Sequence, residues 1–225
     1  ENETWFLTTL PQGKKAKRNH NGKIVKFKAR LVAKGFTQRY GVDYEETFAP
    51  VVRYGSVRYL IALAAQTNLK IHQMDVVTAF LQGDLDEEIY MEQPLGFDDG
   101  TGRHCLLKRS IYGLKQAGRQ WNLKLDATLK HLGYKNCKTD PCIYMNGNLE
   151  LIIAIYVDDF LIFYKSEKAL AELKELLSSK FKMKDMGLAK GCIGIRINQT
   201  GGTIELDQST YVGEILKRFG MDTAK

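Results

Sequence analysis

Paired metal-binding cysteines are absent from this sequence of 225 residues. Its four cysteines form no C-x-x-C motif and its four histidines add no zinc-like spacing, so a zinc site is not expected. The nearest approach to a cluster, His131 with Cys137 and Cys142, is scatter of the kind that core packing produces. Unpaired thiols are typical of reducing compartments, and the sequence therefore predicts an intracellular protein.

Long apolar runs are also absent. No uncharged stretch reaches bilayer length and no N-terminal apolar run precedes a small-residue cleavage site, so we expect neither a membrane span nor a signal peptide. Internal repeats and low-complexity linkers are missing too. With 44% hydrophobic and 26% charged residues, the composition indicates a soluble globular protein with a sizeable core.

Acidic residues are absent between Glu3 and Asp43. The same interval contains ten basic residues, Lys14, Lys15, Lys17, Arg18, Lys23, Lys26, Lys28, Arg30, Lys34 and Arg39, in a chain of formal net charge +7. Such a block predicts salt-dependent, sequence-independent attraction to nucleic acid. The alternative is a disordered basic tail. Interspersed apolar residues, and Asn21-Gly22 as a strong hairpin signal, favour a basic β-ribbon instead.

Two adjacent carboxylates, Asp158 and Asp159, interrupt the apolar stretch from Leu151 to Tyr164. Each flanking run has strand length and is rich in β-branched and aromatic residues, which predicts a β-hairpin with the aspartates at its tip. Like charges so close together raise each other's pKa unless a cation lies beside them, and carboxylate oxygens suit Mg²⁺. The alternative is a solvated turn, where aspartate is common for conformational reasons.

A third apolar-flanked carboxylate, Asp75, ends a predicted strand that begins at Leu69. This residue would complete a metal site with the aspartate pair. The acidic run that follows, Asp84, Asp86, Glu87 and Glu88, is typical of a solvated face rather than a ligand cluster.

Helical spacing appears in four segments. Helices are expected from Ser56, with Ser56 as N-cap, from Leu114 to Gly133, after an N-cap at Ser166, and from Ser209 to Phe219. In the last, the predicted inward residues are Val212, Ile215, Leu216 and Phe219. A second hairpin is predicted from the runs 192–197 and 203–206. Strands and helices mixed in this order predict an α+β fold in a single domain, 1–225.

The sequence Tyr156-Val157-Asp158-Asp159 resembles the Y-x-D-D box of reverse transcriptases, and its surroundings resemble the Ty1/copia type of LTR retrotransposon. Further blocks similar to that family occur in its order, at 28–36, 46–51, 73–81, 111–116 and 140–142. The resemblance implies a fingers-and-palm, right-hand polymerase fold. Its fingers would comprise about 1–70 and 85–125 and its palm 71–84 and 126–206, with 207–225 starting a thumb or connection. A full thumb and an RNase H region are expected to be absent.

The activity implied by the resemblance is RNA-directed DNA polymerisation, the addition of dNTPs to a primer 3′-hydroxyl. Two Mg²⁺ ions, or Mn²⁺ in their place, would be held by the triad Asp75, Asp158 and Asp159. Because neighbouring strand residues point to opposite faces, we expect Asp75 and Asp158 to be better ligands than Asp159.

Other site residues also follow from the resemblance. Phe80 would lie against the incoming sugar, although a core phenylalanine is an equal alternative. Lys28 and Arg30 would hold the triphosphate, or attract phosphate backbones generally. The expected contacts to nucleotide or template are Tyr112 and Gly113, and those to primer or nucleic acid are Tyr156, Val157, Cys192, Ile193 and Gly194.

The partners implied are an RNA template, a DNA primer-template duplex, dNTPs, and the RNase H and integrase regions of a Pol polyprotein, in the cytoplasm or in virus-like particles. The sequence departs from the family in three places. A tryptophan-containing strand is missing between Ala16 and Lys17, Gly118 stands where the family has proline, and the chain stops at Lys225. These departures favour an alternative, a catalytically inactive remnant that binds nucleic acid through its basic N-terminal segment.

Overall fold

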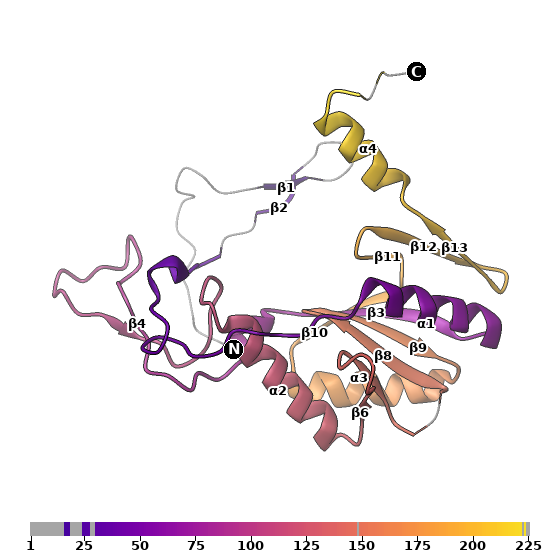
Figure 1. Ribbon diagram of the computed structural model, residues 1–225, viewed down its shortest axis with the longest axis horizontal. Coiled ribbons are helices and arrows are strands. Elements are labelled where there is room, and N and C mark those ends of the chain that lie inside the picture. The colour runs from indigo at the N-terminus through magenta and orange to yellow at the C-terminus, as the bar shows by residue number, and fades with distance from the viewer. Residues whose placement is uncertain (1–15, 19–23, 28–29, 148, 222, 224–225) are drawn as a thin grey trace.

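The computed structural model describes residues 16–18, 24–27, 30–147, 149–221 and 223. A six-stranded antiparallel sheet lies at its centre, in the strand order β10-β3-β9-β8-β7-β6 (Figure 1). The strands are β3 (Lys70–Val76), β6 (Lys135–Asn136), β7 (Ile143–Met145), β8 (Leu151–Tyr156), β9 (Asp159–Tyr164) and β10 (Met183–Leu188). Strands and helices are mixed along the chain, which confirms the α+β class.

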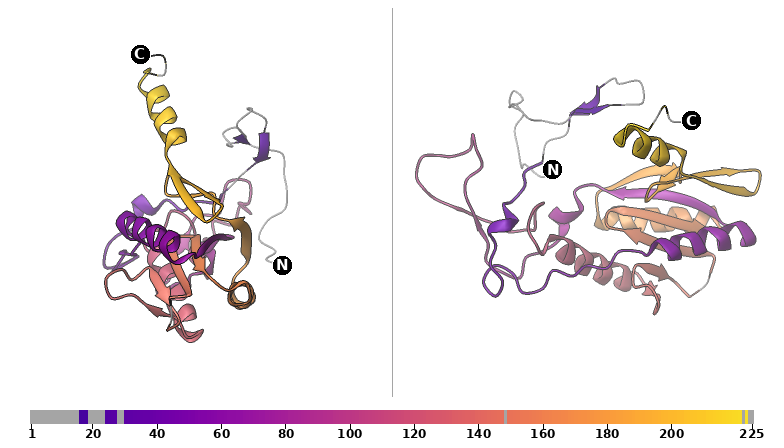
Figure 2. Two further views of the ribbon diagram at one scale, coloured as in Figure 1. Left: turned by 90° about the vertical axis from the view of Figure 1, so that its right-hand side faces the viewer. Right: turned by 45° about the horizontal axis from the view of Figure 1, so that its top comes forward.

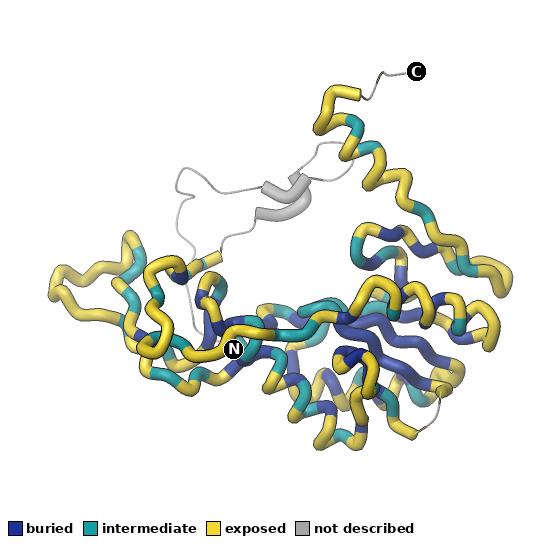
Figure 3. Tube along the Cα trace, viewed as in Figure 1, coloured by how far each residue is buried: buried dark blue, intermediate teal, exposed yellow. Residues whose placement is uncertain are grey.

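The predicted apolar hairpin is β8 and β9, the middle of the sheet, and it is buried on both faces (Figure 3). Phe160 and Ile162 belong to one hydrophobic cluster, whereas Leu161 and Phe163 belong to another on the opposite face. This alternation explains why both runs are apolar throughout rather than at every second residue.

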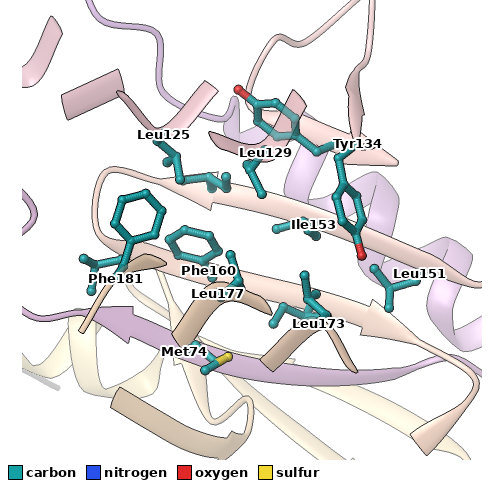
Figure 4. Packing of buried hydrophobic residues seen from close by; sticks show 14 of the residues in the cluster. Met74, Leu125, Leu129, Tyr134, Leu151, Ile153, Phe160, Leu173, Leu177 and Phe181 are labelled. Atoms are coloured by element: carbon teal, nitrogen blue, oxygen red, sulfur yellow. The ribbon is translucent and has the colours of Figure 1, made fainter. Parts of the chain in front are cut away.

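Helices cover both faces of the sheet (Figures 1 and 2). On one face α2 (Ala117–His131) and α3 (Glu167–Lys180) pack Leu125, Leu129, Leu173 and Leu177 toward the hairpin (Figure 4). On the other face α1 (Tyr54–Thr67) packs through Val57, Leu60, Ile61 and Ala64. Each buried set recurs at intervals of three or four residues, as an amphipathic helix requires.

Two of the predicted helix boundaries are close to the observed ones. In α3 the Ser166 hydroxyl accepts a hydrogen bond from the Ala169 amide at 3.3 Å, which confirms the predicted N-cap. The helix α2 starts at Ala117, three residues after the predicted Leu114, and the chain leaves it at Gly133 with φ 88°.

The predicted N-cap of α1 is wrong. This helix begins at Tyr54 with Arg53 as N-cap, so Ser56 lies within its first turn. The Arg53 amide donates to Asp140 Oδ2 at 3.0 Å. This long-range hydrogen bond gives the Arg53 amide a buried carboxylate as its acceptor. The helix therefore begins earlier than the local sequence indicates.

The helix α4 (Ser209–Arg218) has no buried residue, so the predicted inward orientation of its apolar side is wrong. Val212 is 50% exposed, Ile215 37% and Phe219 69%, and Leu216 is half-buried. The reason is positional, because α4 projects away from the central sheet beyond β13 and no described element covers it (Figures 1 and 2).

Smaller sheets complete the fold. A three-stranded sheet comprises β11 (Gly191–Cys192), β12 (Ile195–Thr200) and β13 (Thr203–Asp207), so the second predicted hairpin is present with a shorter turn, Gly201-Gly202. In the N-terminal ribbon, β1 (Ala16–Arg18) pairs antiparallel with β2 (Ile24–Phe27), while its predicted Asn21-Gly22 turn lies outside the described residues. A last pair is β4 (Tyr90–Met91) with β5 (Cys105–Leu106). Across the described ranges, no helix is long and apolar enough to cross a membrane.

Candidate active site

Asp75 and Asp159 lie directly opposite each other in the antiparallel pairing of β3 with β9. Asp158 occupies the two-residue turn that joins β8 to β9, so all three predicted aspartates meet at one end of the sheet. Because opposite residues of paired strands point to the same face, Asp75 and Asp159 share a face. The register thus favours Asp159 as the neighbour of Asp75, and the predicted ranking of Asp158 ahead of Asp159 stays a prediction.

The turn itself has an unusual backbone. Val157 adopts φ 59°, the left-handed region that β-branched residues rarely enter. Two hydrogen bonds hold it, one from Trp121 Nε1–H to the Val157 carbonyl at 2.7 Å and one from the Val76 amide to the Asp158 carbonyl at 3.0 Å. The turn is therefore fixed from α2 on one side and from the end of β3 on the other.

Electrostatics at this end of the sheet disfavour negative charge. Burial raises the pKa of the half-buried Asp159, and the charges of Asp158 and Asp75 raise it further. Against these effects, Gln73 Nε2 donates to Asp159 Oδ1 at 3.4 Å and lowers the pKa. A divalent cation would relieve the repulsion among the three carboxylates.

The donor set fits a magnesium site that is only partly built by protein. In the part of the chain that the structure describes, no three His, Cys, Asp or Glu side chains converge closely enough to hold a metal by themselves. Mg²⁺ is commonly bound by one or two carboxylates together with waters and substrate phosphates rather than by a protein cage. The carboxylates of Asp75, Asp158 and Asp159 are hard oxygen ligands, and they match a site in which water and substrate phosphates complete the coordination of Mg²⁺.

A second group of predicted residues, Phe80, Tyr112 and Arg30, comes together in a tilted stack, and Phe80 follows Asp75 closely in sequence. The rings of Phe80 and Tyr112 have centroids 4.7 Å apart, and Arg30 Cζ lies 4.8 Å from the centroid of Tyr112. Phe80 lies in the short 3-10 helix η2 (Ala79–Gln82) and is half-buried, while Arg30 is exposed. Three of the predicted nucleotide-binding side chains thus come together, whereas Lys28 lies outside the described residues.

Gly113 and Gly35 allow the backbone that follows Arg30 to contact the loop at Tyr112. The Ala33 amide donates to the Tyr112 carbonyl at 2.7 Å. A Cβ on Gly113 would lie 2.2 Å from the Ala33 carbonyl oxygen, and a Cβ on Gly35 would lie 1.9 Å from that of Gly113. Only glycine fits either position, so this contact fixes where the stacked residues meet.

The predicted primer-contact residues lie on the β11–β12 turn and at the end of β8. Ile193 and Gly194 adopt φ 50° and 73° in a tight turn, and Cys192, Ile193 and Tyr156 share a hydrophobic cluster. Burial raises the pKa of the Cys192 thiol to about 12, with a further contribution from the charge of Asp159. Cys192 shares its cluster with the buried residues of α1, so the turn lies on the same side of the sheet as that helix.

Residue-pattern reasoning missed a ladder of polar contacts along α2. Gln116, Gln120 and Lys124, each one turn apart, donate to Glu87 at 3.1 Å, Asp86 at 3.0 Å and Asp84 at 2.8 Å, respectively. Asp84 and Asp86 are solvent-exposed as expected of a solvated face, but these acids also bind the helix. Polar residues at four-residue intervals, facing an acidic run, were the available signal.

Comparisons with known proteins agree with these features. The family model described as reverse transcriptase (RNA-dependent DNA polymerase) matches residues 2–225. The chain is 44% identical over 241 aligned residues to the "Retrovirus-related Pol polyprotein from transposon TNT 1-94" of Nicotiana tabacum, covering 100% of this chain and 18% of that protein. It is 36% identical to the "Retrovirus-related Pol polyprotein from transposon RE1" of Arabidopsis thaliana, covering 100% of this chain and 16% of that protein.

A solved structure of telomerase from Candida albicans, in complex with a fragment of telomeric RNA, superposes with a TM-score of 0.42 at 12% identity. The superposition covers 78% of this chain and 39% of that one. The two Pol polyproteins match the whole of this chain, although the chain is less than a fifth of their length. This chain therefore belongs to the reverse transcriptase (RNA-dependent DNA polymerase) family, in the group found in the Pol polyproteins of Ty1/copia-type retrotransposons.

Proposed function

We propose that this chain adds deoxynucleotides to the 3′-hydroxyl of a DNA primer paired with an RNA template, at a two-metal site made by Asp75, Asp158 and Asp159. The observation that supports the proposal most is the register that sets Asp75 opposite Asp159, beside Asp158. When bound, a pair of divalent ions supplies activation of the attacking hydroxyl and neutralises charge on the leaving pyrophosphate. The three carboxylates hold and orient those ions.

The stack of Arg30, Tyr112 and Phe80 receives the incoming nucleotide in this proposal. Arg30, together with Lys28, binds the triphosphate, because a guanidinium forms paired hydrogen bonds with phosphate oxygens. Phe80 faces the deoxyribose, and Tyr112 with Gly113 contacts the base or template. Two observations support this assignment. Phe80 lies in η2, shortly after the end of β3 that carries Asp75, and the ring centroids of Phe80 and Tyr112 are 4.7 Å apart.

The primer end is proposed to rest on Tyr156 and Val157 and on the turn Cys192-Ile193-Gly194. In support, Tyr156 shares a hydrophobic cluster with Cys192 and Ile193, and it lies opposite Asp159 in the pairing of β8 with β9. We further propose the division into fingers (1–70 and 85–125), palm (71–84 and 126–206) and the start of a thumb (207–225). RNase H and integrase regions would be partners within a Pol polyprotein, in the cytoplasm or in virus-like particles.

A second candidate function is nucleic-acid binding without polymerisation. The uninterrupted basic interval between Glu3 and Asp43 favours it, since counterion release requires only positive charge. The two functions differ in what they require of Asp158, because binding through the basic interval does not involve that carboxylate.

Primer extension on poly-rA with an oligo-dT primer, dTTP and Mg²⁺ tests the proposal. The variant Asp158→Asn removes one carboxylate, and Glu175→Gln, an exposed position on α3, is the matched control. Extension that disappears in Asp158→Asn and persists in Glu175→Gln supports polymerisation. Duplex binding that falls steeply with salt, without extension at any protein concentration, supports the second function and excludes the first.

A further inference from the structure

We propose that Trp121 is a positioning residue for the catalytic turn: its indole N–H holds the Val157 carbonyl and thereby orients the Asp158–Asp159 pair. The role rests on the proposed function, because it matters for chemistry only if those aspartates bind the metal ions. Trp121 touches no substrate in this proposal and acts through the turn alone.

The indole is a fixed anchor. Trp121 is 2% exposed on the buried side of α2, and its ring meets Phe181 edge to face with centroids 5.2 Å apart. Its hydrogen bond to the Val157 carbonyl is 2.7 Å long. The anchor therefore combines a ring locked by core packing with a donor aimed at one acceptor outside its own helix.

The turn has space beside it on the side of Trp121. Val157, at φ 59°, lines an apolar cavity of about 100 Å³ together with Trp121, Gly118 and Pro50. A β-branched residue in the left-handed region reverts to extended backbone unless its surroundings prevent this. With empty space beside the valine, the hydrogen bond from Trp121 is the restraint that remains on this side of the turn.

The restraint acts on Asp158 through the peptide plane. The Val157 carbonyl and the Asp158 amide belong to one rigid unit, so holding the carbonyl sets the direction in which Asp158 leaves the turn. The next carbonyl, that of Asp158, is held by the Val76 amide at 3.0 Å, one residue after Asp75. The backbone on both sides of the Asp158 side chain is thus held by hydrogen bonds, one from Trp121 on α2 and one from Val76 at the end of β3.

The competing explanation is that a buried indole simply needs any acceptor, and that the bond adds stability without affecting the site. The test must therefore remove the N–H while keeping the ring. We choose Trp121→β-(3-benzothienyl)alanine, in which sulfur replaces the N–H, and Trp121→6-fluorotryptophan, which keeps it, as the matched control. Both are made in a Trp5→Phe background, because the sequence contains two tryptophans.

Single-turnover extension of oligo-dT on poly-rA is measured for both proteins. The benzothienyl protein is expected to show a maximal rate lower by about 10- to 100-fold, with the apparent dTTP affinity within about twofold of the control, since small misplacements of catalytic groups have effects of that order. Circular dichroism is expected to be unchanged. Extension by both proteins at equal maximal rates would overturn the inference.

Amide hydrogen exchange separates failure of this inference from failure of the proposed function. The Asp158 and Asp159 amides are expected to exchange at least about 10-fold faster in the benzothienyl protein, because the turn is released. This result supports positioning even if neither protein extends a primer, in which case the polymerase proposal fails. Equal exchange rates refute positioning, whatever the extension assay gives.

Discussion

Asp159 is a residue at which the proposed function and stability oppose each other. Its carboxylate is half-buried and lies near Asp75 and Asp158, and burial followed by those charges raises its pKa. A raised carboxyl pKa in the folded state means that ionisation destabilises the fold. The unfolded chain ionises near pH 4, so this penalty is absent below that pH and fully present above the raised folded pKa.

We therefore predict that Asp159→Asn raises the Tm at pH 7, with a smaller gain at pH 4, while primer extension is lost. The physical reason is removal of one of three repelling charges, and an amide still accepts the Gln73 hydrogen bond. Scanning calorimetry at the two pH values measures the effect. A Tm that falls at pH 7 would contradict the electrostatic account.

Asp185 shows the opposite behaviour. Burial raises the pKa of its carboxyl, but the Lys174 ammonium at 2.5 Å, the Gly187 amide and His72 at 2.6 Å outweigh burial and lower it to about 2. A lowered folded pKa contributes stability above the unfolded value near pH 4, and that stability is lost as the pH falls toward 2.

Accordingly, Asp185→Asn is expected to destabilise the protein by about 1 kcal/mol at pH 7, a figure reduced from that of a buried pair because the Asp185 side chain is 41% exposed. The difference from wild type should shrink between pH 4 and pH 2. Urea denaturation at a series of pH values gives both quantities. Asp98→Asn, at an exposed acid, is the control and should change stability by less than about 0.5 kcal/mol.

At the scale of the element, α2 contacts two separate parts of the candidate site. It presents Trp121 to the catalytic turn, binds the acidic run 84–87, and begins beside Gly113 and the stacked rings. Its weak point is Gly118 in the first turn, because glycine lowers helix stability.

Gly118→Ala is predicted to stabilise the protein by about 0.5–1 kcal/mol, because alanine favours the helix and the new Cβ would meet the Ala49 Cβ at an ordinary 3.5 Å. The matched variant is Gly35→Ala, whose Cβ would lie 1.9 Å from the Gly113 carbonyl oxygen. That variant should be strongly destabilised. Chemical denaturation of both proteins compares them, and stabilisation by Gly35→Ala would show that the contact is not tight.

Local sequence predicted those elements whose pattern is complete within the element. The apolar runs of β8 and β9, the buried face of α2 and the Ser166 cap all follow from side chains a few residues apart. Of the site, the apolar-flanked aspartates were predicted from the residue pattern, and the stacked residues from the family resemblance. Their meeting depends on strand register and on the Gly35–Gly113 contact, which joins positions far apart in the chain.

The features that the sequence could not predict also depend on contacts between residues far apart in the chain. The start of α1 depends on a bond between Arg53 and Asp140, 87 residues apart, and the Trp121–Val157 bond joins residues 36 apart. The orientation of α4 could not be inferred because an amphipathic pattern shows which side is apolar and not whether a partner covers it.

At the scale of the whole molecule, charge is divided unevenly along the chain. The net charge is +7 and ten basic residues precede Asp43 without an acid after Glu3. The slope of log K against log [salt] for binding of a primer-template duplex is negative. We predict that replacing Lys14, Lys15, Lys17 and Arg18 together with glutamine reduces its magnitude by about 3 to 4, since each phosphate contact contributes about 0.9.

Fluorescence anisotropy between 50 and 200 mM salt, a range of about fourfold, measures this slope. The control replaces four exposed lysines on or near the face that carries α3, namely Lys135, Lys165, Lys168 and Lys180. Its slope should stay close to that of wild type. Equal losses in both variants would indicate a diffuse electrostatic effect rather than a binding segment.

The double-sided burial of the β8–β9 hairpin also matters before the protein is folded. As the chain leaves the ribosome, residues 151–164 form a segment of high β-propensity whose only charges are Asp158 and Asp159. Such isolated charges act as gatekeepers that keep nascent strands from associating with one another. Variants that neutralise this pair should thus yield more inclusion bodies despite a more stable native state, because Asp158 and Asp159 help to keep the newly synthesised chain from aggregating.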